Sequence, residues 1–338
     1  MNTRRKKLKI ILAAGFLILL VLVTIYQIGA PAKQVSFGVN FSAPNAEYLG
    51  LPWRETYLSI LTDLRPKYMR LMTYWETLEP QPGQFSFSDV DWMLAEAAKH
   101  NTKILLVVGH KQPRWPECHH PDWYNHLSPQ QQQQQAILTM LTAAVNHFKS
   151  FSNITAWQVE NESLFNYGEN CPVISRSFLE KEVALVKQLD SRPIMLTDSG
   201  EKGAWLPTAR SGADIFGATM YRKVYDTRWR RYIEYPLPTF TYNLKAGLVK
   251  IFSRAKKTIG SELQAEPWFQ KDIRDTPVAD QLQLMNAQIF ADYVNYAKAV
   301  GFEQNYFWGV EWWYWLGKTQ NNWSMWDAGK KVLQSANF

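Results

Sequence analysis

The sequence predicts an α/β fold of the (β/α)8 TIM-barrel class, preceded by one N-terminal transmembrane helix. Three observations support this prediction. Eight short apolar runs, most of them followed by a helical pattern, alternate over roughly 300 residues, a length that suits such a barrel. The run at residues 103–109 is continuously apolar, as in strands buried on both faces of a parallel sheet. A longer apolar segment lies near the N-terminus, at residues 10–28.

This N-terminal segment has the features of a membrane anchor. It is about 19 residues long, close to the roughly 20 that a helix needs to span a bilayer. The basic residues before it are Arg4, Arg5, Lys6, Lys7 and Lys9. Because basic flanks stay in the cytoplasm, we expect residues 1–9 to be a cytoplasmic tail, residues 10–28 to cross the membrane once and residues 34–338 to fold outside the cytoplasm.

Secretion after cleavage of a signal peptide is the alternative, since Ala30-Pro31-Ala32 resembles a cleavage site. The apolar regions of signal peptides are usually shorter, at roughly 7–15 residues. The length of the segment therefore favours an uncleaved anchor.

The predicted elements alternate between strand and helix. The expected strands are residues 36–41, 68–73, 103–109, 154–161, 193–198, 215–221, 258–265 and 306–312. The expected helices lie near residues 54–64, 87–100, 130–148, 175–189, 205–211 and 278–300. Ser128 is an expected N-cap, with Pro129 as the first helical residue. Residues 223–257 are expected to be an irregular insertion, long for a βα loop.

Other classes of protein have less support. A doubly wound open sheet competes with the barrel, but no glycine-rich phosphate loop opens a helix in this sequence. The net charge of +7 is concentrated in the N-terminal tail and around residues 222–231, which does not favour a nucleic-acid partner.

Two glutamates end predicted strands. Glu162 ends the fourth strand and Glu262 ends the seventh. Catalytic groups of barrel enzymes lie at the carboxyl ends of the strands, and cleavage of a glycosidic bond needs two carboxyl groups. Two alternatives stay open. Glu160 shares the alternation of Glu162, and Glu266 replaces Glu262 if the seventh strand is longer than expected.

These motifs resemble the glycoside hydrolases of clan A, which include cellulases, mannanases and β-galactosidases. The resemblance covers roughly residues 34–338 and rests on Asn161-Glu162 and Glu262. A segment of the second βα unit also fits, with Arg70-Leu71, Trp75, Glu79-Pro80, Gly83, Phe85, Phe87 and Asp91. The resemblance implies Glu162 as acid/base and Glu262 as nucleophile of a retaining enzyme, and it implies no metal or organic cofactor.

Four further residues are candidates for substrate binding. Arg70 is placed to orient the nucleophile carboxylate by charge-assisted hydrogen bonds. Asn161 is expected to bind the sugar 2-hydroxyl. His110 ends the third strand, where it contacts substrate or an acid. Tyr221 ends the sixth strand and is expected to donate to the nucleophile.

Aromatic and cysteine residues add two expectations. Trp308 is expected to form the floor of a sugar subsite, and Trp312 and Trp313 share its predicted strand. Trp115 and Trp268 lie in loops that line the cleft. The two cysteines, Cys118 and Cys171, lie in loops after strands, either as a disulfide or as free thiols.

The sequence therefore predicts a membrane-anchored retaining glycoside hydrolase acting on a β-linked carbohydrate by double displacement, with residues 34–338 as its catalytic domain. An inactive polysaccharide-binding barrel and a transglycosylase are the alternatives. The sequence does not name the sugar or the linkage, nor does it distinguish endo from exo action.

Overall fold

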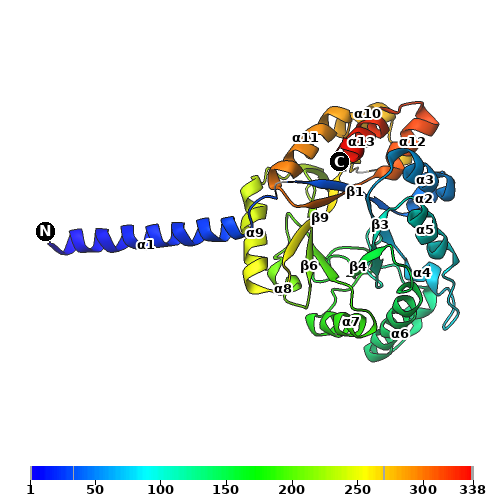
Figure 1. Cartoon of the computed structure of the whole chain (residues 1–338), viewed down its shortest axis with the longest axis horizontal. Helices are drawn as coiled ribbons and strands as arrows, with labels where there is room; N and C mark the ends of the chain where they lie inside the picture. Colours follow the sequence, from blue (N-terminus) through cyan, green and yellow to red (C-terminus); the bar gives the residue numbers. More distant parts are fainter. Residues whose placement is uncertain (1, 33, 269–270, 336–338) are drawn as a thin grey trace.

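The computed structural model describes residues 2–32, 34–268 and 271–335, and it contains the predicted closed barrel of eight parallel strands. Around the barrel the strand order is β1-β10-β9-β6-β5-β4-β3-β2. The strands are β1 (Ser36–Phe41), β2 (Tyr68–Met72), β3 (Lys103–Val108), β4 (Ile154–Val159), β5 (Ile194–Asp198), β6 (Ile215–Met220), β9 (Lys257–Gln264) and β10 (Gln304–Trp308). Figure 1 shows the barrel end on, with helices around its outside.

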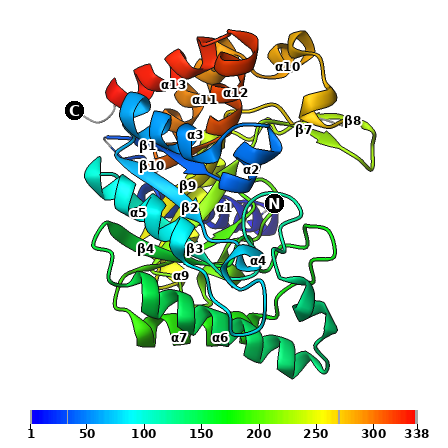
Figure 2. The same ribbon diagram turned by 90° about the vertical axis from the view of Figure 1, so that its right-hand side faces the viewer.

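Helices cover the outer face of the barrel and short helical turns shape its loops. The longer ones are α5 (Ser88–Lys99), α6 (Gln130–Phe148), α7 (Arg176–Leu189), α9 (Thr239–Phe252), α11 (Ala287–Val300), α12 (Val310–Gln320) and α13 (Ser324–Ser335). The shorter ones are α2 (Ala43–Tyr48), α3 (Trp53–Ser59), α4 (Trp75–Leu78), α8 (Leu206–Ala209), α10 (Val278–Leu284), a π-helical turn (Ile60–Leu64) and two 3-10 turns (Asp122–His126, Ile273–Asp275). Figure 2, turned by 90°, shows the strands from the side, running between these helices.

The alternation of side chains along the strands separates two apolar cores. The main core lies between the strands and the helices and contains outward residues such as Ile104 and Leu106 of β3. Leu105, between them, belongs to a second cluster inside the barrel. The other buried members of that inner cluster are Ala156, Met195, Ile259 and Tyr306. The interior is therefore filled, and we call the carboxyl ends of the strands, where barrel enzymes carry their catalytic groups, the rim.

A single long helix, α1 (Asn2–Ile28), precedes the barrel. Its part Arg5–Ile28 is long and apolar enough to cross a membrane, and none of its most apolar window is buried. Figure 1 shows α1 extending away from the side of the barrel, with only its C-terminal end near α9.

Four expectations about local structure were wrong. Residues 223–257 are not irregular: they contain a hairpin of β7 (Lys223–Asp226) and β8 (Arg231–Glu234), followed by α9. The single helix expected at residues 278–300 is two helices, because the Asn286 side chain accepts hydrogen bonds from the first N–H groups of α11 and caps a new helix. The remaining two concern Pro129 and the last strand.

Pro129 occupies the N-cap position of α6 rather than the first helical position, so Ser128 does not cap this helix. The last strand ends at Trp308, and the chain then turns into α12. Trp312 and Trp313 therefore lie on a buried helix and not on the strand, where their indoles belong to the main core.

Candidate active site

Glu162 and Glu262, here called the carboxylate pair, both lie at the rim. Glu162 follows the end of β4, and Glu262 lies near the end of β9. The strands β5 and β6 separate β4 from β9 in the barrel, so the two glutamates come from different sides of the opening. Their exposed fractions are 8% and 5%, which makes both carboxyl groups largely desolvated.

Two donors hold the carboxylate of Glu262. The Arg70 Nη1 donates to Oε1 at 2.8 Å, and the Tyr221 hydroxyl donates to Oε2 at 2.8 Å. Burial, followed by the negative charge of Glu262, raises the pKa of Tyr221 well above its usual value. The phenol therefore keeps its proton and remains a donor to Glu262 at neutral pH.

Arg70 connects three strands beneath the rim. Its side chain is fully buried on β2, and besides Glu262 it donates from Nε to Gln158 Oε1 at 2.7 Å. Its Nη2 donates to Asn161 Oδ1 at 2.9 Å. Because a guanidinium is a rigid planar fork of donors, these bonds fix Glu262 and Asn161 relative to each other.

Glu162 has a different environment. Its backbone N–H donates to the Thr197 hydroxyl at 2.8 Å, which fixes the turn after β4. Burial raises the pKa of the Glu162 carboxyl well above its usual value, and the negative charges of Glu262 and Glu117 raise it further. Such a carboxyl group holds a proton at a pH where an ordinary glutamate has lost it.

A third carboxyl group, Glu117, lies at the same site and was not predicted. The Asn161 Nδ2 donates to Glu117 Oε2 at 3.1 Å, and burial together with the charge of Glu262 raises the pKa of Glu117 to about 8. Glu117 lies in the loop after β3, and a disulfide between its neighbour Cys118 and Cys171 ties this loop to the one after β4. Of the two states considered for the cysteines, the disulfide is the one present, and it holds Glu117 beside Asn161.

Lys111 is the second unpredicted residue near the pair. Its side chain is buried, and Nζ donates to the carbonyl oxygens of Glu162 at 3.1 Å and Phe165 at 2.8 Å. Burial lowers the pKa of Lys111, although nearby glutamates oppose that shift. The sequence contains one indication of its position: Lys111 follows the apolar run at 103–109, and residues after a barrel strand lie near the rim.

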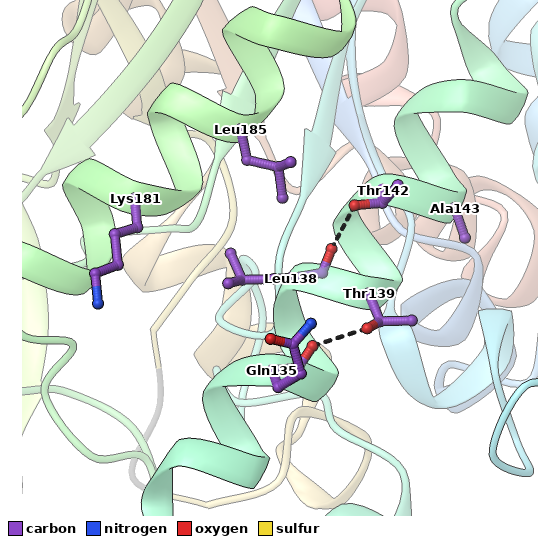
Figure 3. A pocket seen from close by; sticks show the side chains of 7 residues that line it. All are labelled: Gln135, Leu138, Thr139, Thr142, Ala143, Lys181 and Leu185. Atoms are coloured by element: carbon purple, nitrogen blue, oxygen red, sulfur yellow. Dashed lines mark hydrogen bonds between the residues drawn. The ribbon is translucent and has the colours of Figure 1, made fainter.

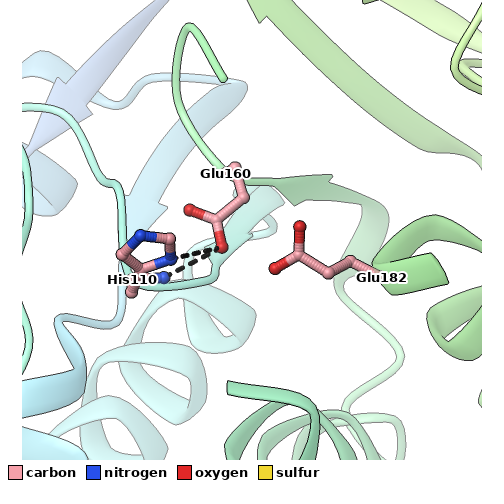
Figure 4. Close-up of side chains that lie close together, drawn as sticks. All are labelled: His110, Glu160 and Glu182. Atoms are coloured by element: carbon pink, nitrogen blue, oxygen red, sulfur yellow. Dashed lines mark hydrogen bonds and ion pairs between the residues drawn. The ribbon is translucent and has the colours of Figure 1, made fainter. Parts of the chain in front are cut away.

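His110, Glu160 and Glu182 form a buried cluster of their own (Figure 4). The Nδ1 atom of His110 lies 3.1 Å from Glu160 Oε1, and the backbone N–H groups of His110 and Lys111 also donate to this carboxylate. Glu182 of α7 faces them, and the three side chains offer polar atoms within 4.8 Å of one another. Burial and the charge of Glu160 raise the pKa of Glu182 well above its usual value, which favours the protonated form of this carboxyl group.

Glu266 belongs to a separate ion-pair cluster. Arg114 pairs with Glu266, and its Nη2 lies 3.0 Å from Glu311 Oε2. The same guanidinium lies over the ring of Trp308, 4.1 Å from the ring centroid. Glu266 is thus held beside Trp308, and Glu262 is the carboxylate that contacts Arg70 and Tyr221.

Aromatic rings surround the opening next to Tyr221. Trp268 lies edge-on to Tyr221 with ring centroids 5.2 Å apart, and Tyr167 follows at 6.4 Å from Trp268. Trp115 meets Tyr167 at 5.9 Å and has 59% of its surface exposed. The two loop tryptophans expected near the cleft therefore lie in one aromatic row that begins at the carboxylate pair.

A hollow on the outer surface lies away from the rim, between α6 and α7 (Figure 3). Its lining residues are Gln135, Leu138, Thr139, Thr142, Ala143, Lys181 and Leu185. They come from the solvent-facing sides of the two helices and not from strand ends, so we assign no chemistry to this hollow.

Comparisons with known proteins bear on the family and the fold. A model of glycosyl hydrolase family 10 matches residues 72–181. No curated protein sequence matches the chain. Among solved structures, a glycosylated endo-β-1,4-xylanase of family 10 from Gloeophyllum trabeum has a TM-score of 0.59 at 18% identity, over 89% of this chain and 97% of that one.

Two further solved structures have similar barrels. A GH5_18 protein from Bifidobacterium longum has a TM-score of 0.59 at 11% identity, over 82% of this chain and 70% of that chain. An exo-β-1,4-mannosidase from an Opitutaceae bacterium has a TM-score of 0.55 at 11% identity, over 82% and 52%. These likenesses establish the fold, and the family model covers the part of the chain that carries Glu162. The resemblance to the clan A glycoside hydrolases, which the strand-end glutamates predict, is therefore confirmed.

Proposed function

We propose that this protein is a retaining glycoside hydrolase that cleaves β-O-glycosidic bonds, with Glu162 and Glu262 as its catalytic carboxyl groups. The observation that carries the proposal is the contrast between their surroundings. Arg70 and Tyr221 donate to Glu262, which suits a charged nucleophile. Within the described residues no donor contacts the Glu162 carboxyl group, and its pKa is raised by burial and by Glu262. That environment suits a proton donor.

The reaction then proceeds in two displacements. Glu162 gives its proton to the glycosidic oxygen while a Glu262 oxygen attacks the anomeric carbon, so that the bond to the leaving group breaks and an ester to Glu262 forms. Glu162, now a carboxylate, takes a proton from water as the water oxygen attacks the same carbon and releases Glu262. Both glutamates end in their starting protonation states.

Four neighbours have proposed roles in binding and positioning. Arg70 and Tyr221 position the nucleophile through their hydrogen bonds to it. Asn161 lies within reach of the same arginine, and we assign it to the sugar 2-hydroxyl, whose contact strengthens in the transition state. Trp308, with Arg114 over its ring, is assigned to the sugar subsite.

The proposed substrate class is a β-1,4-linked glycan. The family 10 xylanase and the mannosidase with similar barrels are both named for β-1,4 linkages, and the row from Tyr221 to Trp115 offers several aromatic faces or edges beside the pair. Such rings pack against the apolar faces of pyranoses. We expect more than one sugar unit of the substrate to be bound.

The test uses the full chain in detergent with aryl β-xylosides, β-mannosides and β-glucosides and with β-1,4-linked xylan and mannan. Proton NMR spectra recorded in the first minutes of the reaction identify the anomer of the sugar that is released. Early appearance of the β-anomer supports the proposal, and early α-anomer refutes retention. Binding without cleavage indicates the polysaccharide-binding alternative, and longer oligosaccharide products indicate transglycosylation.

We also propose that α1 anchors the protein, with residues 1–9 in the cytoplasm, residues 10–28 in the membrane and the catalytic domain at 34–338 outside the cytoplasm. The exposed apolar surface of α1 and the disulfide Cys118–Cys171 both support this arrangement. Carbonate extraction and protease accessibility of the domain in intact spheroplasts test it. Release of the protein as a soluble chain that starts after residue 28 would support the cleaved signal peptide instead.

A further inference from the structure

The helix α9 carries an apolar stripe that nothing in the barrel covers. Phe240, Leu248, Ile251 and Phe252 have exposed fractions of 51%, 36%, 41% and 55%. These positions, with half-buried Leu244, recur at the spacing of one helix face. The opposite face is buried against the barrel through Tyr242, Ala246 and Val249. An apolar stripe of this kind on an outer helix usually marks a surface that binds another apolar body.

The stripe lies directly beside the end of α1. A Cβ atom on Gly247 of α9 would lie 2.1 Å from the Ile25 carbonyl oxygen, and one on Gly29 would lie 1.9 Å from that of Asn243. The two backbones therefore touch, and side chains at these glycines would separate them. The Lys250 Nζ also donates to the Ile28 carbonyl oxygen at 3.1 Å. Thus α9 crosses α1 at the last turn of the apolar segment.

The direction of the stripe follows from these contacts. On a helical projection, Asn243, Gly247 and Lys250, which contact the end of α1, lie between the stripe and the barrel-facing residues, and the stripe lies opposite the barrel-facing residues. In Figure 1, α9 lies across the base of α1, and α1 leaves on the side of α9 away from the barrel. The stripe therefore faces the same side as α1, toward any membrane that α1 spans.

Basic side chains border the stripe at the C-terminal end of α9. Lys250 is half-buried, and Arg254 and Lys256 are exposed. Lysine and arginine at such a border place their charges among lipid headgroups while their carbon chains stay in the apolar layer. An apolar face with a basic border is the pattern of a helix that lies in the plane of a bilayer surface.

We propose that α9 is an interfacial helix whose stripe, Phe240, Leu244, Leu248, Ile251 and Phe252, is embedded in the surface of the lipid bilayer that α1 crosses. The protein is then held at two places, by a spanning helix and by a helix lying flat beside it. This inference goes beyond the glycosidase activity and depends on the proposed anchor. The chemistry of the partner is a phospholipid surface.

The experiment places an environment-sensitive fluorophore on single introduced cysteines of the full chain, reconstituted in phosphatidylcholine vesicles with or without a nitroxide-labelled lipid. The native cysteines are joined to each other and do not react. The test positions are Leu248→Cys and Phe252→Cys. Val21→Cys, within α1, reports insertion of the anchor. Gln131→Cys, exposed on α6 at a different side of the barrel, is the aqueous control.

A nitroxide near the headgroups should quench about half of the emission of a fluorophore attached at position 248 or 252, because such groups lie at the headgroup–acyl boundary. It should quench less than about a tenth of the emission of a fluorophore at position 131. Quenching at Val21 by a deeply placed nitroxide, with none at the α9 positions, would overturn the proposal. Absence of quenching at Val21 as well would overturn it together with the anchor, whereas the glycosidase assay would be unaffected. A third outcome would assign the stripe to a second copy of the chain. In that case the nitroxide lipid does not quench the fluorophore at position 252, and its protection from aqueous iodide increases with the protein density in the vesicles.

Discussion

The Arg70 guanidinium lies 2.8 Å from the Glu262 carboxylate, and the side chains are only 0% and 6% exposed. Removing one partner of such a buried ion pair leaves the other charge without compensation. The other donors of Arg70 contact Gln158 and Asn161, so the same group that stabilises the Glu262 charge also aligns the residue before Glu162. The geometry of the site therefore depends on one side chain from β2.

The Glu262→Gln variant should lose turnover while keeping its fold. An amide cannot form the glycosyl ester, so kcat on an aryl β-glycoside should fall by about a thousandfold or more. Circular dichroism checks the fold, and the Glu303→Gln variant, changed at an exposed residue, is the control. Turnover that stays within a few-fold of the unmodified protein would remove Glu262 as the nucleophile and direct attention to Glu266.

The Glu162→Gln variant should separate substrates by their leaving groups. A good leaving group departs without a proton, whereas a sugar leaving group needs one, and general acid catalysis contributes about 100- to 10,000-fold. We expect kcat/KM to fall far more on an oligosaccharide than on a dinitrophenyl glycoside. Equal losses on both substrates would show that Glu162 is not the acid.

The Glu117→Gln variant should narrow the pH range of activity on its alkaline side. In the proposed mechanism catalysis needs protonated Glu162, so activity should fall as pH rises through the pKa of that group. Because burial and the charge of Glu262 raise the pKa of Glu117 to about 8, its negative charge develops on the alkaline limb, where it is one of the causes that raise the pKa of Glu162. Without that charge, the alkaline limb of the pH profile of kcat/KM should move to lower pH.

A matched variant for this measurement is Glu169→Gln, at an exposed residue near the disulfide. It should leave the alkaline limb unchanged. If both variants shift the limb equally, the effect is one of general surface charge and not of Glu117 beside Asn161.

The Tyr221→Phe variant should reduce kcat by about ten- to a hundredfold, since it removes one hydrogen bond to a buried charged group, worth about 1.5–3 kcal/mol. The Tyr232→Phe variant, in the β7–β8 hairpin, serves as the control because that ring is partly exposed and lies away from the pair. Steady-state kinetics with one aryl glycoside decide the point. An unchanged kcat would mean that Arg70 alone positions Glu262.

Replacement of both Cys118 and Cys171 by serine should destabilise the domain by about 3–4 kcal/mol. The bond closes a loop with a sequence separation of 53 residues, and the entropy of such a loop sets this magnitude. Denaturant unfolding measures it. Because the same bond holds the loop of Glu117, the alkaline limb of the pH profile should shift as it does in Glu117→Gln.

The sequence predicts the barrel well because short apolar runs alternate with helical patterns along the chain, and the run at 103–109 is continuously apolar, as in a strand of a parallel sheet. β1 begins and ends where the pattern indicates, and the eight strands occur in the expected order. Glu162 and Glu262 could be placed at the rim because the position of a strand end fixes where its last side chains lie. Tyr221 followed from the same reasoning, whereas Arg70 followed from its place within the second predicted strand.

Other residues could not be predicted because they depend on contacts between distant loops. Glu117 and Lys111 lie in a loop without periodicity, and their positions depend on the disulfide and on bonds to the loop after β4. The helix α9 was missed because its apolar residues lie on more than one face, toward the barrel and on the uncovered stripe. Trp312 and Trp313 looked like strand residues because a buried helix and a buried strand are equally apolar.

Figures 1 and 2 show that α1 departs from the flank of the barrel and not from either of its ends. A barrel anchored in this way lies on its side, with the barrel axis parallel to the plane of the bilayer. The opening at the rim then faces sideways along the membrane. Under the proposed anchoring and activity, a polysaccharide bound at the rim would run along the membrane surface instead of standing upright on it. A glycan attached to the lipid would then reach the carboxylate pair without bending away from the surface.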